Sequence, residues 1–165
     1  PTGTLTELDA EKWRRGWDLK VFGFIDLTRI LYPRMLARKS GVIINVIGAA
    51  AEMPSPHYIA GCVGNSALNT FSDCLGAEAM RHGVRVVAVN PGATETDRQV
   101  VRWRARAEKE LGSAERWREL VTGFPFARLG TVDEIANMVA FLCSDCSGYT
   151  TGCVITIDGG ASHQK

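Results

Sequence analysis

The stretch "VIINVIGAAAEMPSPHYIAGCVGNSALNTF" (Val42–Phe71) places a phenol just after a short apolar run. Tyr58 follows a loop that holds Pro54 and Pro56, and it precedes a segment with helical spacing. A free phenol has a pKa of about 10, and a neighbouring ammonium group lowers this pKa because it stabilises the phenolate. A tyrosine beside a cation is therefore a suitable proton donor to a carbonyl oxygen on which negative charge develops.

A second chemically suggestive stretch is Asn90-Pro91-Gly92, which follows the apolar run Val84–Val89. A Pro-Gly turn at the carboxyl end of a strand exposes backbone groups, and α/β sheets bind their ligands at that end. We therefore interpret this turn as part of a binding site. The alternative is that the turn only reverses the chain.

Both stretches need a sheet to position them, and three near-continuous apolar runs are typical of strands buried on both faces of a parallel sheet. Segments with helical spacing alternate with these runs. Gly83 is a good helix stop, and Thr131 with Glu134 predicts a capping box. The expected strands are Val42–Ile47, Val84–Val89 and Val154–Ile157, and the expected helices run from Glu11 to about Leu36, from about Tyr58 to His82, and from Val132 to Cys143. This alternation predicts a layered α/β domain with right-handed crossovers, in which residues 1–165 form a single domain.

Composition limits the classes of function. The chain has 165 residues, a formal net charge of +1, 45% hydrophobic and 22% charged residues, which predicts a soluble globular domain. The balanced charge does not favour nucleic acid or a membrane as the partner, and we expect a cytoplasmic protein. Five cysteines without a secretory leader predict reduced thiols. The lone Cys143/Cys146 pair lacks further ligands, so no metal site is predicted.

The segment Asp97–Phe126 is helical in pattern and crowded with charges of both signs, with Trp103 and Trp117 among them. Basic residues interleaved with aromatics can bind nucleic acid, but the acidic residues here nearly cancel them. Two interpretations remain for this segment. It is either a solvated helical insertion or, because it follows the carboxyl end of a strand, a lid over a substrate.

From Trp13 onward the chain resembles the short-chain dehydrogenase/reductase family. The stretches that carry the resemblance are "VIINVIG", "GNSALNTFSDCLGAEAMRHGVRVVAVNPGATETD" and "FARLGTVDEIANMVAFLCSDCSGYTTGCVITIDGG". The resemblance implies a Rossmann-like doubly wound parallel sheet and an oxidoreductase that transfers a hydride between NAD or NADP and a ketone or secondary alcohol. The family's glycine-rich phosphate loop is not found in these 165 residues. We therefore expect that the N-terminal dinucleotide-binding strands are missing from this chain and that it is a fragment of a longer protein.

The family's catalytic tetrad of Asn, Ser, Tyr and Lys falls on Lys20, Gly48, Gly61 and Asn65, so all four positions differ. Tyr58 precedes the expected tyrosine position by three residues. We hypothesise a rearranged site in which Tyr58 is the proton donor, Lys20 supplies the cation from a facing helix, and Asn65 takes the bridging role of the family's asparagine. Gly48 offers no side-chain donor.

Other interpretations of these residues stay open. Lys20 is alternatively a surface residue, Asn65 a helix cap, and Tyr58 a core or rim aromatic. The protein would then be a non-catalytic binding or scaffold relative that keeps the fold and the oligomer, or an enzyme that uses other residues.

The resemblance also carries expectations about the cofactor and about assembly. It implies that the nicotinamide end of the cofactor is contacted by Pro91, Gly92, Ala93, Thr94 and Thr96. It further implies that the helices Tyr58–His82 and Val132–Cys143 pair across two-fold axes, which predicts a homodimer or homotetramer. Apart from other copies of the chain, the expected partner is a small-molecule substrate.

Overall fold

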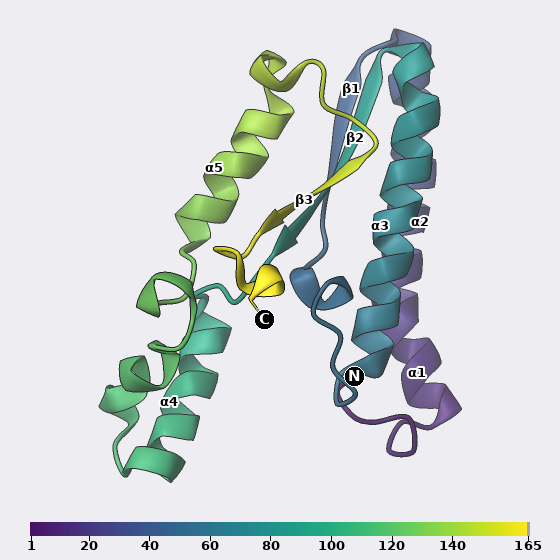
Figure 1. Ribbon diagram of the computed structural model, residues 1–165. Coiled ribbons are helices and arrows are strands. Elements are labelled where there is room, and N and C mark those ends of the chain that lie inside the picture. The colour runs from purple at the N-terminus through teal and green to yellow at the C-terminus, as the bar shows by residue number, and fades with distance from the viewer. Residues whose placement is uncertain (165) are drawn as a thin grey trace.

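The computed structural model describes residues 1–164, and at its centre lies a parallel three-stranded sheet in the order β1-β2-β3. The strands are β1 (Gly41–Val46), β2 (Val84–Pro91) and β3 (Cys153–Ile157). Gly41 pairs with Val84, and Val87 pairs with Cys153. Helices α2 (Gly23–Arg38) and α3 (Ile59–Ala79) cover one face of the sheet, and α5 (Val132–Cys143) covers the other (Figure 1). The chain therefore has the α/β, Rossmann-like architecture that the sequence predicts.

The central strand β2 explains why the apolar runs are continuous rather than alternating. Val84 and Val86 pack with Ala79 toward α2 and α3, whereas Val87 and Val89 pack with Leu142 of α5. These four valines are fully buried. A strand that buries side chains on both faces is mostly apolar along its length, and the three predicted strands are confirmed.

The N-terminal part of the helical layer is one long run that is interrupted by a π-helical segment. It consists of α1 (Ala10–Trp17), a π-helical segment at Asp18–Phe22, and α2 (Gly23–Arg38). The sequence predicts helix over this range but not the π-helical segment. The indole N–H of Trp17 donates a 3.0 Å hydrogen bond to the carbonyl of Ala60, which ties this run to the start of the next helix.

Helix α3 (Ile59–Ala79) lies beside α2 and continues as a short 3-10 turn at Met80–His82. Gly83 has φ of 71°, a left-handed conformation that glycine adopts without a side-chain clash, and it ends the helix as predicted.

None of the helices in residues 1–164 is long and apolar enough to cross a lipid bilayer.

The charged segment after β2 forms α4 (Asp97–Leu111) and a 3-10 run at Ala114–Val121. These elements enclose a small core of their own, made by Ala107, Trp117, Val121 and Leu129. They extend beyond the carboxyl end of the sheet (Figure 1). Closure of this segment over a substrate stays a prediction.

Helix α5 (Val132–Cys143) begins with the predicted capping box. The backbone N–H of Glu134 donates to the hydroxyl of Thr131 at 3.1 Å, and the N–H of Thr131 donates to the Glu134 carboxylate at 2.7 Å. Hydrogen bonds from Arg128, and from this Thr131 N–H, lower the pKa of Glu134 to about 2. The carboxylate therefore stays ionised in the folded protein at any pH well above that value.

The first testable prediction concerns this cap. Thr131→Ala is expected to lower the free energy of unfolding by about 1 kcal/mol, because it leaves the N–H of Glu134 without its acceptor. Urea denaturation at neutral pH measures the change. Thr122→Ala is the matched control, since the Thr122 hydroxyl only donates to the carbonyl of Glu119. Equal losses in the two variants would contradict the capping role.

Candidate active site

A cavity of about 750 Å³ opens at the carboxyl end of the sheet. One wall is formed by α1, the π-helical segment and the start of α3, and the opposite wall by the first turns of α4. Lys20 and Tyr58 line the first wall, and Thr96, Arg98 and Arg102 line the second. Two of the three predicted catalytic residues therefore border the same space.

The ring of Tyr58 lies directly over Gly61. A Cβ atom added to Gly61 would be 2.0 Å from the Cζ atom of this ring, which is far inside contact distance. Tyr58 is the N-cap residue of α3, with φ of −136° and ψ of 32°, and its side chain folds back over the first turn of the helix. The ring thus fills the space above position 61, where the resemblance places a tyrosine.

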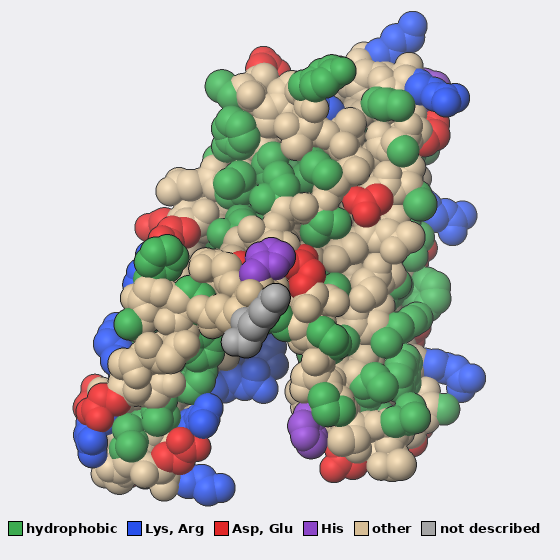
Figure 2. Space-filling view, in the orientation of Figure 1, with side chains coloured by type: hydrophobic (Ala, Val, Ile, Leu, Met, Phe, Trp, Pro, Cys, Tyr) green, Lys and Arg blue, Asp and Glu red, His purple; other side chains and the backbone are tan. Residues whose placement is uncertain are grey.

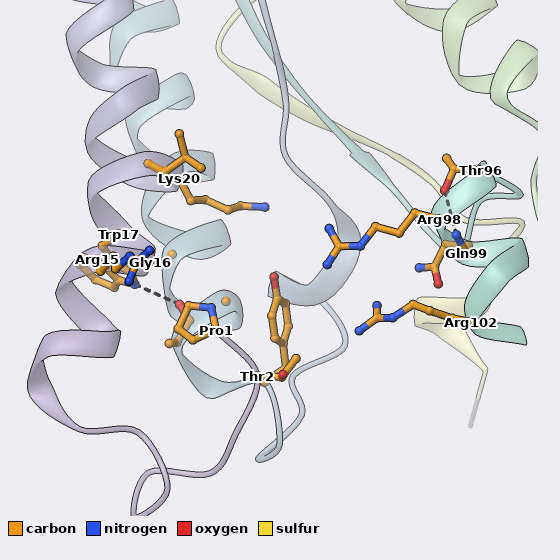
Figure 3. A pocket seen from close by; sticks show the side chains of 15 residues that line it. Pro1, Thr2, Arg15, Gly16, Trp17, Lys20, Thr96, Arg98, Gln99 and Arg102 are labelled. Carbon is orange, nitrogen blue, oxygen red and sulfur yellow. Dashed lines mark hydrogen bonds between the residues drawn. The ribbon is translucent and has the colours of Figure 1, made fainter. Parts of the chain in front are cut away.

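Lys20 lies on the π-helical segment and is half-buried. Its ammonium group donates a 3.1 Å hydrogen bond to the carbonyl of Ile47, in the loop that follows β1. Burial lowers the pKa of Lys20 from its usual value, because a charged ammonium loses hydration there. Figure 3 shows the side chain reaching from its helix into the cavity, so Lys20 is not a lysine held out in solvent.

Asn65 is almost fully buried, with 2% of its surface exposed. Its amide nitrogen donates a 2.8 Å hydrogen bond to the carbonyl of Gly48, and within residues 1–164 its amide oxygen has no hydrogen-bond partner. Asn65 lies inside α3 and not at its start, so the helix-cap interpretation is wrong. Unlike Lys20 and Tyr58, it does not line the cavity. Its bridging role stays a prediction.

A polar network behind this loop was missed by the sequence analysis. Asn90, fully buried at the end of β2, accepts a 3.3 Å hydrogen bond from the Gly48 N–H and donates a 2.8 Å bond to the carboxylate of Glu52. Thr156 of β3 donates to the same carboxylate at 2.6 Å. The network joins the carboxyl ends of all three strands. Its sequence signal is Asn90 itself, a polar residue closing an apolar run.

The segment Pro91–Thr96, which we expected at the nicotinamide, is largely engaged with the protein itself. The Gly92 N–H donates to the Ile157 carbonyl at 2.9 Å, and the Gly130 N–H donates to the Ala93 carbonyl at 2.9 Å. The Thr96 hydroxyl accepts from Gln99 at the start of α4. Of the five predicted cofactor contacts, only Thr96 lines the 750 Å³ cavity. The turn therefore exposes fewer backbone groups than its sequence implies.

Within residues 1–164, no group of three or more His, Cys, Asp or Glu side chains is placed to hold a metal ion. A phenol and a half-buried ammonium group border the same cavity, and a phenol in such a place could transfer a proton.

Comparison with known proteins gives consistent matches along the whole chain. The family model described as enoyl-(acyl carrier protein) reductase matches residues 1–162. The 2,3-dihydro-2,3-dihydroxybenzoate dehydrogenase of Bacillus subtilis is 32% identical over 163 residues, which are 97% of this chain and 61% of that protein.

Solved structures agree with the sequence match. L-sorbose reductase from Gluconobacter frateurii, complexed with NADPH and L-sorbose, has a TM-score of 0.91 and 29% identity, covering 100% of this chain and 64% of that one. An NADPH-bound short-chain oxidoreductase from Pseudomonas aeruginosa that contains an atypical catalytic center has a TM-score of 0.82 and 29% identity, covering 99% of this chain and 62% of that one. The chain thus spans less than two thirds of the length of these similar proteins.

The contact between Tyr58 and Gly61 yields a second prediction. Gly61→Ala is expected to displace the Tyr58 ring and to destabilise the protein by about 1–3 kcal/mol, because the new methyl group overlaps the ring. In a Tyr58→Ala background the same change is expected to stabilise by up to about 1 kcal/mol, since alanine is the better helix former. Thermal or urea unfolding of the four variants measures both effects. The same destabilisation in both backgrounds would show that the ring does not occupy this space.

Proposed function

The chain belongs to the short-chain dehydrogenase/reductase family, and from this premise we propose that it forms the substrate-binding and proton-transferring part of an NAD(P)-dependent oxidoreductase. The proposed reaction transfers a hydride between NAD or NADP and a ketone or secondary alcohol. The observation that carries this proposal is the shared cavity of Tyr58 and Lys20 at the carboxyl end of the parallel sheet.

Proton transfer in this proposal depends on Tyr58. When a ketone is reduced, its carbon receives the hydride that the bound cofactor supplies, and negative charge develops on its oxygen. The Tyr58 hydroxyl donates the proton that neutralises this charge, and in alcohol oxidation the phenolate accepts it. Lys20, anchored to the Ile47 carbonyl, supplies positive charge that favours the phenolate. Because Gly48 has no side chain to donate a hydrogen bond, the oxygen relies more heavily on Tyr58.

The residues present fit only one end of a dinucleotide. We assign the nicotinamide end to Pro91, Gly92, Ala93, Thr94 and Thr96, with Thr96 closest to the cavity that holds Lys20. A pyrophosphate is usually held by a glycine-rich loop at a helix N-terminus, and residues 1–164 contain no such loop. We therefore propose that the pyrophosphate is held by residues that these 165 residues do not include.

The free edge of β1 supports the proposal that further strands, beyond these 165 residues, bind the rest of the dinucleotide. Among the described residues β1 has a paired strand on one side only. Next to it lies a 350 Å³ groove lined mostly by apolar side chains, among them Phe24, Leu27 and Ile43. Leu27 and Ile30 are about 60% exposed, at 59% and 61%. An apolar groove beside an unpaired strand is the place where further strands of a dinucleotide-binding half would pack.

The competing candidate is a binding or scaffold relative without hydride chemistry. It is favoured by the replacement of all four tetrad residues, at Lys20, Gly48, Gly61 and Asn65. A scaffold would tolerate loss of Tyr58 and Lys20 without functional consequence, whereas the proposed enzyme would not.

A double-mutant cycle separates the two candidates. In the complete gene product, Lys20→Met and Tyr58→Phe are each expected to lower kcat/KM by about 100-fold or more, because general acid catalysis contributes effects of this size. The double variant should lose little beyond either single variant, since the two groups act as one unit. Steady-state reduction of a panel of ketones measures the losses.

Lys109→Met, an exposed lysine on α4, is the control for loss of a charge elsewhere. If the two single losses are small and simply add, or if the unaltered protein reduces no ketone at all, the non-catalytic candidate replaces the enzyme.

Assembly is the second part of the proposal. We propose a homodimer or homotetramer that pairs α3 and α5 across two-fold axes, because both helices leave large apolar side chains exposed. Val63 and Met80 on or next to α3 are 44% and 58% exposed, and Val132 and Phe141 on α5 are 51% and 48% exposed.

Light scattering tests this assembly. The purified 18.0 kDa chain is expected to give a mass two or four times that value, and Val63→Asp or Phe141→Asp should reduce it by disrupting an interface. Val101→Asp, on the exposed side of α4, should leave the mass unchanged. A monomer mass at micromolar concentration would exclude this arrangement.

A further inference from the structure

The wall of the cavity opposite Lys20 carries two arginines on one face of α4. Arg98 and Arg102 are four residues apart, a spacing that places side chains on the same side of a helix. Both guanidinium groups reach from α4 into the cavity, toward the side from which Lys20 enters (Figure 3). Three cationic side chains thus converge on one space.

The charge of this cavity has a single sign. Arg15 adds a fourth cationic side chain to the lining, and none of the lining residues is Asp or Glu. Figure 2 shows Lys and Arg side chains beside the notch that separates the segment containing α4 from the N-terminal helices. Like charges gathered without a counter-charge repel one another, and a bound anion relieves this repulsion.

The other arginines of the segment Asp97–Phe126 differ from Arg98 and Arg102, because they are paired with carboxylates. Within residues 1–164, Arg104, Arg106, Arg116 and Arg118 each form an ion pair with a glutamate. Arg98 and Arg102 form no ion pair and no side-chain hydrogen bond with any described residue, although carboxylates are abundant on the same segment. The arginines left unpaired are those directed into the cavity.

We propose that the substrate carries a carboxylate or phosphate group and that Arg98 and Arg102 bind it. A guanidinium group binds such oxyanions through two parallel hydrogen bonds, and α4 begins at this wall, where the positive end of its dipole adds attraction for an anion. Thr96 and Gln99 provide neutral polar groups on the same wall.

The anion belongs to the substrate in this proposal, because Tyr58 and Lys20 border the same cavity. The inference rests on the proposed function for the reaction, but the anion site can be tested without turnover. A space of about 750 Å³ is large enough for a substrate that spans from Arg98 to Tyr58.

The test is a binding comparison between cyclohexanecarboxylate and its neutral counterpart, cyclohexanecarboxamide, by calorimetry or ligand-observed NMR. The carboxylate is expected to bind at least about tenfold more tightly than the amide, with an affinity that falls as NaCl is added. Arg98→Gln with Arg102→Gln should weaken carboxylate binding at least about tenfold. Arg104→Gln with Arg106→Gln, on the same helix but paired outside the cavity, should leave it unchanged.

Three other outcomes would overturn the proposal. Equal binding of carboxylate and amide would show that the cavity does not select an anion, and equal loss in both double variants would show a general charge effect. If Arg98→Gln with Arg102→Gln instead weakens binding of NADP⁺ and leaves carboxylate binding intact, the anion is the cofactor's phosphate. Retained carboxylate selectivity in a protein that reduces no ketone would remove the proposed reaction but keep the anion site.

Discussion

Two consecutive carbonyl groups after β1, those of Ile47 and Gly48, determine how the candidate site is built. Lys20 donates to the first and Asn65 donates to the second, at 3.1 and 2.8 Å. The loop itself is fixed to β2, because the Ile47 N–H donates to Val89 and the Gly48 N–H to the side chain of Asn90. A buried carbonyl group that accepts no hydrogen bond lowers the stability of the fold. The loop is fixed to β2, so its two carbonyl groups in turn fix the positions of Lys20 and Asn65.

In the rearranged site that we propose, lysine and asparagine satisfy both of these carbonyl groups. One donor comes from the π-helical segment before β1 and the other from α3, which follows β1. The two donors affect the cavity differently. Lys20 brings the positive charge in from the π-helical segment, whereas the buried amide of Asn65 keeps the α3 side neutral. π-helical segments are frequent at functional sites, and here one presents the residue on which the proposed chemistry depends.

Much of the fold could be predicted because its signals are local or periodic. The strands follow from valines buried on both faces of β2, and the start of α5 follows from the Thr131–Glu134 pair. The site was predicted less well. Nothing in the sequence "DLKVF" marks a π-helical segment, and the fold of the Tyr58 ring over Gly61 depends on a loop conformation. The direction of Arg98 and Arg102 depends on how α4 packs against its neighbours, among them Trp117 and Leu129, which periodicity does not report.

The overlap between a side chain at position 61 and the ring at position 58 also limits which substitutions this site can accept. An aromatic residue at 58 in this conformation and any residue larger than glycine at 61 exclude each other. A residue larger than glycine at position 61 is therefore accepted only if the Tyr58 ring leaves its present place, so the two positions must change together.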